Sequence, residues 1–522
     1  MVKRIFLLTV ALVLQYASVT QAAESDSTPR GNTTAILAQL RADMELARNQ
    51  TGIPGMGVAI IHKGKLIFAE GFGKRNKKDP FTPETRSMLG SLTKAFTATA
   101  IGELVAEGKL DWDTTPVNTY LPEFETIDPL VTSQLTLKDL LSHRTNFPPL
   151  DFSWLWGTED VRNLIKRIRY VEIKSKLGVL TNYNNIMYCV AGEAAAKVAG
   201  IPFTKLVRNK VLKPLGLSNT GFSMSEMAKK PNFAVPFQAA SYEDAVAGRF
   251  TELPLDGASD LSTAAGDMYA SVLDLARWGQ AVLSEGMVDG KQVLSKANIA
   301  ATLTSQTVYA GYVRHPDLAP STQYGMGWVL NQYKGNNIFE HGGHHFGYVT
   351  NLALFPNAEL VVAHVTNAGT TGLPMYLAYH VADQLLGLPK SIDWLNVNAI
   401  LASKNMWAWE KAREKGIFPP RVPNKPPTHE LSGYVGEYLH SGHGTATVSL
   451  EDNQLHISLA AFKGVLTHYH YDSFTTVFEH SALKMGELIT FSIGTDGSVS
   501  GVSFSAQGAP VVAVKKQPKV AA

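Results

Sequence analysis

Ser91 and Lys94 are the residues whose types and spacing could support nucleophilic catalysis. They stand three positions apart at the start of a stretch with helical periodicity, so both side chains should lie on one helical face within reach of each other. The helix N-terminus and the loss of surrounding water would lower the pKa of the lysine, and its neutral amine could then accept the serine proton. A second Ser-x-x-Lys, Ser481 to Lys484, lies among strand signals with no helix to orient it, so the pattern is weak without its context.

Two groups of residues further along the chain could complete such a site. Tyr183 and Asn185 precede a helical stretch, and a run of histidines and glycines extends from His341 to His345. A simpler interpretation makes Tyr183 a loop residue and Asn185 a helix N-cap. The histidines could suggest zinc, but on a strand they would point to different faces, and no carboxylate or cysteine pattern completes a ligand set. We therefore expect no metal and no cofactor.

Three short motifs occur here in the order found in the serine β-lactamase and penicillin-binding-protein superfamily. They are Ser91-x-x-Lys94, Tyr183-x-Asn185 and His341-x-Gly343. The sequence resembles most the class C β-lactamases, the family VIII esterases and the secreted animal β-lactamase-like proteins, including the gigasin type of shell-matrix protein. Supporting matches lie at 108–113, 135–143 and 274–278, and the resemblance covers about residues 35–388.

This resemblance implies roles for the motif residues. Ser91 would be the acylated nucleophile, Lys94 its partner and Tyr183 the general base, while Asn185 would contact both substrate and lysine. His341 would be a catalytic residue on the opposite wall of the cleft.

The run that follows His341 is expected to bind substrate. Gly343 would leave room for a substrate along the strand, since it has no side chain. The backbone amides of Ser91 and His344 would form the oxyanion hole, where one donor is worth about 3 kcal/mol. Two departures from the family stand out: His143 to Asn146 replaces His-Thr-Ser-Gly, and Gly266-Asp267 replaces Gly-Gly.

The elements that must position these residues are of mixed type. Residues 57–71 contain two apolar runs around a polar turn, which predicts a strand hairpin. Helical periodicity dominates the middle of the chain, and strand signals return at 325–330, 349–355 and 360–365. With the resemblance, this predicts an α/β (α+β) fold: a β-lactamase/transpeptidase-like antiparallel sheet with an inserted helical subdomain. A linker is expected at 389–430, because 418–427 is rich in proline, and a small C-terminal antiparallel β domain at 431–517.

The N-terminus predicts export. Residues 1–22 combine Lys3 and Arg4, a short apolar run and small residues, which is typical of a cleaved signal peptide. The mature protein is expected to be secreted and extracellular, without a membrane segment. Asn32 and Asn49 begin Asn-x-Thr triplets and are candidate glycosylation sites. The formal net charge of +2 over 522 residues, without a long basic run, argues against nucleic acid as a partner.

Two functions follow from this sequence. The first is a serine hydrolase that cleaves ester or amide bonds of a small molecule or peptide through an acyl-enzyme. Hydrolysis of β-lactams fits less well, because His341 lacks the permanent charge of the lysine usual at that position. The second is a catalytically silent β-lactamase-like protein that binds ligands or extracellular matrix components.

Overall fold

The computed structural model describes residues 33–151, 160–173, 178, 181–255, 263–309, 317–318, 321–480, 483–506 and 509–516. The chain divides into two compact units, Met1–Gln39 and Leu40–Ala522. The described part of the first unit is the beginning of helix α2 (Thr33–Gln50). All structural statements below concern the second unit.

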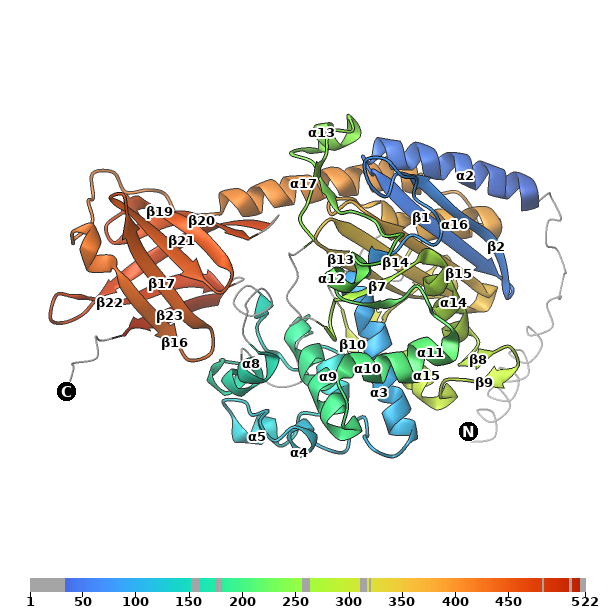
Figure 1. Ribbon diagram of the computed structural model, residues 1–522, viewed down its shortest axis with the longest axis horizontal. Coiled ribbons are helices and arrows are strands. Elements are labelled where there is room, and N and C mark those ends of the chain that lie inside the picture. The colour runs from blue at the N-terminus through green and yellow to red at the C-terminus, as the bar shows by residue number, and fades with distance from the viewer. Residues whose placement is uncertain are drawn as a thin grey trace, which may run out of the picture. The chain divides into compact units, whose positions relative to one another are not determined.

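An eight-stranded antiparallel sheet forms the centre of the N-terminal domain (Figure 1). Its strands, in spatial order, are β10 (Thr307–Val308), β11 (Gln323–Tyr324), β12 (Val329–Tyr333), β13 (Asn336–His345), β14 (Tyr348–Phe355), β15 (Leu360–Thr366), β1 (Gly55–His62) and β2 (Lys65–Gly73). β1 pairs with β15, so strands from the two ends of the domain lie side by side. This confirms the predicted sheet with a helical insertion between its first and last strands.

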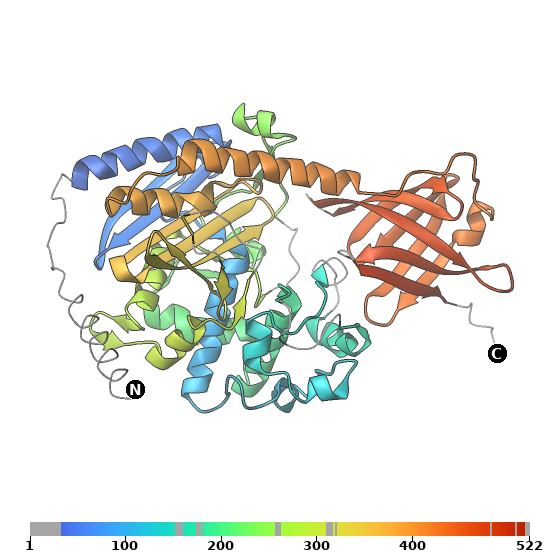
Figure 2. The same ribbon diagram turned by 180° about the vertical axis from the view of Figure 1, so that it is seen from behind.

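Helices cover both faces of the sheet (Figures 1 and 2). α14 (Val272–Leu283) lies so close to one face that a Cβ on its Gly279 would be 2.9 Å from a methyl group of Val361. α16 (Leu373–Leu385) covers the other face, where Tyr379 donates a hydrogen bond of 2.7 Å to the buried carboxylate of Glu340. The sheet is therefore buried on both sides, as its continuous apolar strands require.

The inserted region is mostly helical. Its helices are α3 (Thr93–Ala106), α4 (Val117–Tyr120), α5 (Pro129–Thr132), α6 (Leu137–Leu141), α8 (Val161–Arg167), α9 (Asn185–Ala199), α10 (Phe203–Val207), α11 (Lys213–Leu215), α12 (Met224–Met227), α13 (Tyr242–Val246) and α15 (Lys296–Thr302). α3 is buried on nearly all its faces. Its Phe96 stacks on Trp278 of α14 at 3.7 Å between ring centroids, and Trp278 stacks in turn on Trp328. These rings fix the helix that follows Ser91 between α14 and the start of β12.

The segment expected to be a linker, 389–430, differs from the prediction because much of it is helical. It contains a π-helical turn, η6 (Trp394–Ala399), and the helix α17 (Ile400–Lys415). The buried indole of Trp394 donates a 2.8 Å hydrogen bond to Tyr333 of the main sheet. The part up to α17 thus packs as a component of the N-terminal domain.

The C-terminal region is a closed antiparallel barrel of eight strands, which confirms the predicted antiparallel β domain. The strands are β16 (Gly436–His440), β17 (Gly444–Glu451), β18 (Gln454–Leu459), β19 (Phe462–His470), β20 (Ser473–His480), β21 (Leu483–Ile493), β22 (Val499–Ala506) and β23 (Ala509–Lys515). Aromatic rings fill its interior: Phe491 lies 4.8 Å from Tyr434 and 5.7 Å from Phe474 between ring centroids. Closure leaves no sheet edge exposed for pairing.

Within the described residues, no single helix is long and apolar enough to cross a membrane. A bent pair, α9 with the segment Phe203–Leu215, meets the criteria of length and composition only jointly.

Candidate active site

Ser91 lies in a tight 3₁₀ turn, η1 (Gly90–Leu92), which leads directly into α3. The turn depends on Gly90, whose φ of +55° is one that residues with side chains rarely adopt. A Cβ at this position would lie 2.4 Å from the carbonyl oxygen of His344 and 2.6 Å from its nitrogen. The backbone of β13 therefore lies directly against the turn, which brings the amides of Ser91 and His344 into one region, as an oxyanion hole requires.

Backbone packing requires a glycine at position 343. A Cβ there would be 1.8 Å from the carbonyl oxygen of Leu89, so only glycine lets β13 approach the residues that precede Ser91. The same carbonyl accepts a 2.8 Å hydrogen bond from Thr350 of β14. At Gly342, in contrast, a Cβ would come no closer than 3.5 Å to any neighbouring atom. The geometry explains Gly343 through the strand's contact with the nucleophile turn, whereas its substrate-binding role stays a prediction.

Lys94 is fully buried, and its ammonium group has three partners. Nζ lies 3.1 Å from Ser91 Oγ, 2.6 Å from Asn185 Oδ1 and 2.9 Å from the carbonyl oxygen of Ala265. Burial lowers its pKa to about 7, although the negative charge of Asp151 opposes the shift. Near neutral pH a large fraction of Lys94 is therefore neutral and able to accept the Ser91 proton.

Asn185 is the first residue of α9 and does not cap it. The cap is Asn184, whose side chain accepts a 3.1 Å hydrogen bond from the backbone amide of Met187. The amide side chain of Asn185 is then available to accept from Lys94 with Oδ1 and to donate to Asp151 with Nδ2 at 3.0 Å. The simpler interpretation of this motif, with Asn185 as the N-cap, is thus wrong by one residue.

Tyr183 lies over Lys94, with Nζ 4.9 Å from the ring centroid, and the neighbouring Ser91 hydroxyl partly opposes the rise of its pKa. Burial raises the pKa of Tyr183 well above its usual value of 10, so its hydroxyl is protonated at neutral pH. The structure therefore favours Lys94 over Tyr183 as the base. A protonated tyrosine beside the nucleophile is instead suited to donating a proton to a leaving group.

His341 is buried, and its hydrogen bonds define its protonation. Nδ1 lies 2.6 Å from the carbonyl oxygen of Gly342, so it must donate there, and Nε2 accepts from the Tyr324 hydroxyl at 2.9 Å. Burial, assisted by the charge of Lys94, lowers its pKa to about 3. His341 is therefore neutral, and its hydrogen bond with the Tyr324 hydroxyl holds that side chain in place. A neutral His341 offers no positive charge to a substrate carboxylate.

His143 is a site residue whose role sequence reasoning missed. Its φ is +61°, its ring lies 4.2 Å from that of Tyr183 between centroids, and its Nδ1 accepts the backbone amide of Asn184 at 3.1 Å. Burial lowers its pKa well below 6.5, which keeps it a neutral acceptor. His143 thus positions both Tyr183 and the start of α9. The sequence did contain an indication that His143 belongs to the site, because this residue is the last one of the supporting family match at 135–143.

The two departures from the family have different consequences. Asn146 has a φ of +59°, and asparagine is one of the few residues with a side chain that tolerate this conformation. Asp267 is not among the positive-φ residues of the described chain, and its carboxylate lies 3.7 Å from His345 Nε2. The first replacement keeps the turn, and the second adds an acidic side chain beside the histidine.

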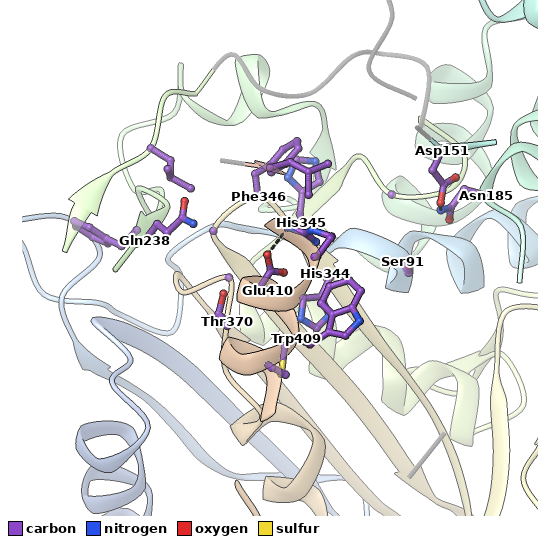
Figure 3. Close-up of a pocket in the computed structure, with 18 of the residues that line it drawn as sticks. Ser91, Asp151, Asn185, Gln238, His344, His345, Phe346, Thr370, Trp409 and Glu410 are labelled. Atoms are coloured by element: carbon purple, nitrogen blue, oxygen red, sulfur yellow. Dashed lines mark hydrogen bonds and ion pairs between the residues drawn. The ribbon is translucent and has the colours of Figure 1, made fainter. Parts of the chain in front are cut away.

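Ser91 opens into a cavity of about 750 Å³ (Figure 3). Asp151 and Asn185 line it on the side of the helical region, and the end of β13 lines it with His344. Another wall comes from α17, from which Trp409 and Glu410 project in Figure 3. Sequence reasoning missed this wall completely, because it assigned α17 to the linker.

The remaining predicted residues carry little further information. Asn49 is exposed at the end of α2, whereas Asn32 and the predicted signal peptide lie outside the described residues. Lys484, from the second Ser-x-x-Lys, lies on β21 and pairs with Glu479 at 3.0 Å. Within the part of the chain that the structure describes, no group of three or more His, Cys, Asp or Glu side chains is arranged to hold a metal ion.

Fold and site together define a protein of the serine β-lactamase and penicillin-binding-protein superfamily. The β-lactamase family model matches residues 34–386, and the chain belongs to that family. A second match, to a domain of unknown function (DUF3471), covers residues 420–516 and so coincides with the barrel.

Individual relatives agree with this assignment. The chain is 30% identical over 421 residues, 77% of its own length and 76% of the other's, to an unguisins hydrolase of Aspergillus campestris. An octameric penicillin-binding protein homologue from Pyrococcus abyssi has a similar fold, with a TM-score of 0.58 and 22% identity over 91% of this chain and 99% of that one. EstCE1, a hydrolase with promiscuous acyltransferase activity, matches with a TM-score of 0.56 and 19% identity over 67% of this chain and 98% of its own.

Proposed function

We propose that this protein is a secreted serine hydrolase that cleaves amide or ester bonds of small molecules or peptides through an acyl-Ser91 intermediate. The observation that carries the proposal is the buried Lys94, hydrogen-bonded to Ser91 at 3.1 Å and with its pKa lowered to about 7. A buried lysine held next to a serine, at the mouth of a large cavity, is costly to folding and valuable to nucleophilic catalysis. The hydrolase names of the relatives support the same class of reaction.

The reaction follows from the protonation states. Neutral Lys94 takes the proton of Ser91 Oγ as the oxygen attacks the substrate carbonyl carbon, and the backbone amides of Ser91 and His344 stabilise the oxyanion. When the tetrahedral intermediate collapses, the bond to the leaving nitrogen or oxygen breaks. Tyr183 donates its proton to that atom and is reprotonated at the expense of the Lys94 ammonium. Water then attacks the acyl carbonyl, and Lys94, neutral again, accepts its proton. The ester bond to Ser91 Oγ breaks as the Lys94 ammonium returns that proton to Oγ, which releases the acid and restores Ser91.

Secretion rests on the signal-peptide pattern of residues 1–22. The exposed Asn49 would then meet the glycosylation machinery in a eukaryotic secretory route. Expression of the full chain in secreting cells, followed by N-terminal sequencing of protein from the medium, tests this part. A mature N-terminus close to residue 23 is expected, and retention of Met1 inside the cell would contradict it.

The catalytic part is tested by covalent labelling of the purified mature protein with a fluorophosphonate and with a fluorescent penicillin, read by intact mass. Ser91→Ala should abolish labelling, while Ser481→Ala, which removes the serine of the second Ser-x-x-Lys, should leave it unchanged. Failure of the folded wild-type protein to react with either probe would instead favour the matrix or binding role.

A further inference from the structure

The wall that α17 contributes to the Ser91 cavity is built around an exposed tryptophan. Trp409 keeps 61% of its surface accessible, although large aromatic side chains are usually buried. The Arg413 guanidinium stacks over its ring at 4.9 Å. Arg413 is itself held, because it forms an ion pair with Glu410 and donates from Nε to the carbonyl oxygen of Lys484 at 3.1 Å. The indole is thus a fixed platform that costs little further ordering when a ligand binds.

The chemistry of the cavity favours a neutral apolar group beside this platform. Six of the described lining side chains are large and apolar: Phe237, Leu253, Phe346, Met406, Trp409 and Leu483. The charged side chains on the α17 wall, Glu410 and Arg413, neutralise each other. Asp151, on the opposite side, is bonded to Asn185.

The positions of the proton donors indicate which part of a substrate enters the cavity. A leaving group must lie where Tyr183 can donate a proton to it, on the side of Ser91 that also holds His341. Neither Tyr183 nor His341 is among the described residues that line the cavity with Trp409. With the leaving group beside Tyr183, the cavity is left for the acyl part of the substrate, which would then extend towards α17.

We propose that Trp409 determines acyl-group specificity, and that the preferred substrates carry an aromatic or large branched apolar side chain on the acyl side of the scissile bond. For a peptide, this is the residue on the N-terminal side of the cleaved amide. The inference rests on the proposed serine hydrolase function and assigns a substrate class to it. Trp409 lies on α17, outside the β-lactamase family match, which ends at residue 386. It would thus determine which substrates are cleaved at the site that the family's motifs form.

The test compares two esters with one leaving group, p-nitrophenyl acetate and p-nitrophenyl 3-phenylpropanoate. In the wild-type protein kcat/KM should be higher for the phenylpropanoate. Trp409→Ala should lower kcat/KM for the phenylpropanoate roughly tenfold or more and for the acetate less than about threefold, because only the larger acyl group reaches the indole. Trp409→Phe, which keeps an aromatic ring at this position, should retain most of the wild-type preference for the phenylpropanoate over the acetate. The ratio between the two acyl groups should be the same with 4-methylumbelliferyl esters, whose leaving group differs.

Leu401→Ala is the matched control, since Leu401 is an apolar residue of α17 that is 56% exposed and is not among the described lining residues of the cavity. It should leave both rates unchanged. Equal losses on both esters in Trp409→Ala, or no loss on either, would overturn the proposal while fluorophosphonate labelling of Ser91 still supported the hydrolase. Absence of labelling and of turnover in the wild-type protein would refute the hydrolase function, and this inference with it.

Discussion

The protonation of Lys94 makes the strongest quantitative prediction. An ordinary lysine with a pKa of 10.5 is neutral in only roughly one molecule in three thousand at pH 7, whereas a pKa of about 7 makes about half of the molecules neutral. The difference corresponds to about 5 kcal/mol in favour of the neutral amine. If neutral Lys94 is the base, the rate of Ser91 acylation should rise with pH through a midpoint near 7. Below pH 6 it should fall about tenfold per pH unit.

The assay is the pH dependence of kcat/KM for p-nitrophenyl 3-phenylpropanoate between pH 5 and 9, with the rate of fluorophosphonate labelling as a second measure. Lys94→Arg should abolish both, since a guanidinium stays charged throughout this range. Asp151→Asn should move the midpoint to lower pH, because the Asp151 charge raises the pKa of Lys94. A profile that is flat from pH 5 to 9, or a midpoint near 10, would refute the assignment of Lys94 as the base.

His345 offers a control substitution on the cavity wall. His345 lies 3.7 Å from the carboxylate of Asp267 and lines the cavity that contains Ser91. His345→Gln removes this group and leaves Lys94 with all three of its hydrogen-bond partners. The midpoint should stay near 7 in this variant, and its disappearance would contradict the assignment of the profile to Lys94.

Three further predictions concern the scaffold. Gly90→Ala should cost at least about 3 kcal/mol of unfolding free energy in urea, because its Cβ meets the backbone of β13, whereas Gly108→Ala, at a positive φ in open space, should cost about 1 kcal/mol. His143→Ala should lower kcat by roughly ten- to a hundredfold with little change in KM, because Tyr183 loses its positioning partner while the cavity is unchanged; a change in KM alone would contradict this role. Asp383→Ala should lower the unfolding free energy by about 3–5 kcal/mol, because it removes the carboxylate closest to the largely buried ammonium of Lys334, which lies 2.8 Å from it. The activity per folded molecule should persist.

Local patterns predicted the parts of the site that depend on local geometry. Helical spacing is enough to place Lys94 beside Ser91, and continuous apolar runs are enough to identify β14 and β15. β13 has no such run, because glycines, histidines and asparagines outnumber its two apolar residues, Ile338 and Phe339. The strand is held by its neighbours and by its contact with the Ser91 turn, which are long-range interactions that no sequence window contains.

The protonation states could not be predicted from residue types. The predicted roles of Tyr183 as a base and His341 as a catalytic group stay predictions, but residue types gave no sign that the site raises the pKa of the tyrosine and lowers that of the histidine. α17 was missed for a different reason. Its sequence is rich in lysine, glutamate and tryptophan, and the proline-rich stretch after it suggested an extended linker, so its packing against the cavity became visible only in three dimensions.

The pairing of β1 with β15 also constrains the order in which the protein can assemble. Synthesis delivers the β1–β2 hairpin early, but the strand beside it is made only after the whole helical insertion. β13, which supplies the backbone behind Ser91, is likewise made late. Contacts of such long sequence separation form slowly. A nascent chain that ends before Leu360 thus contains Ser91 but lacks the strand that pairs with β1, and the eight-stranded sheet can be completed only near the end of the domain's synthesis.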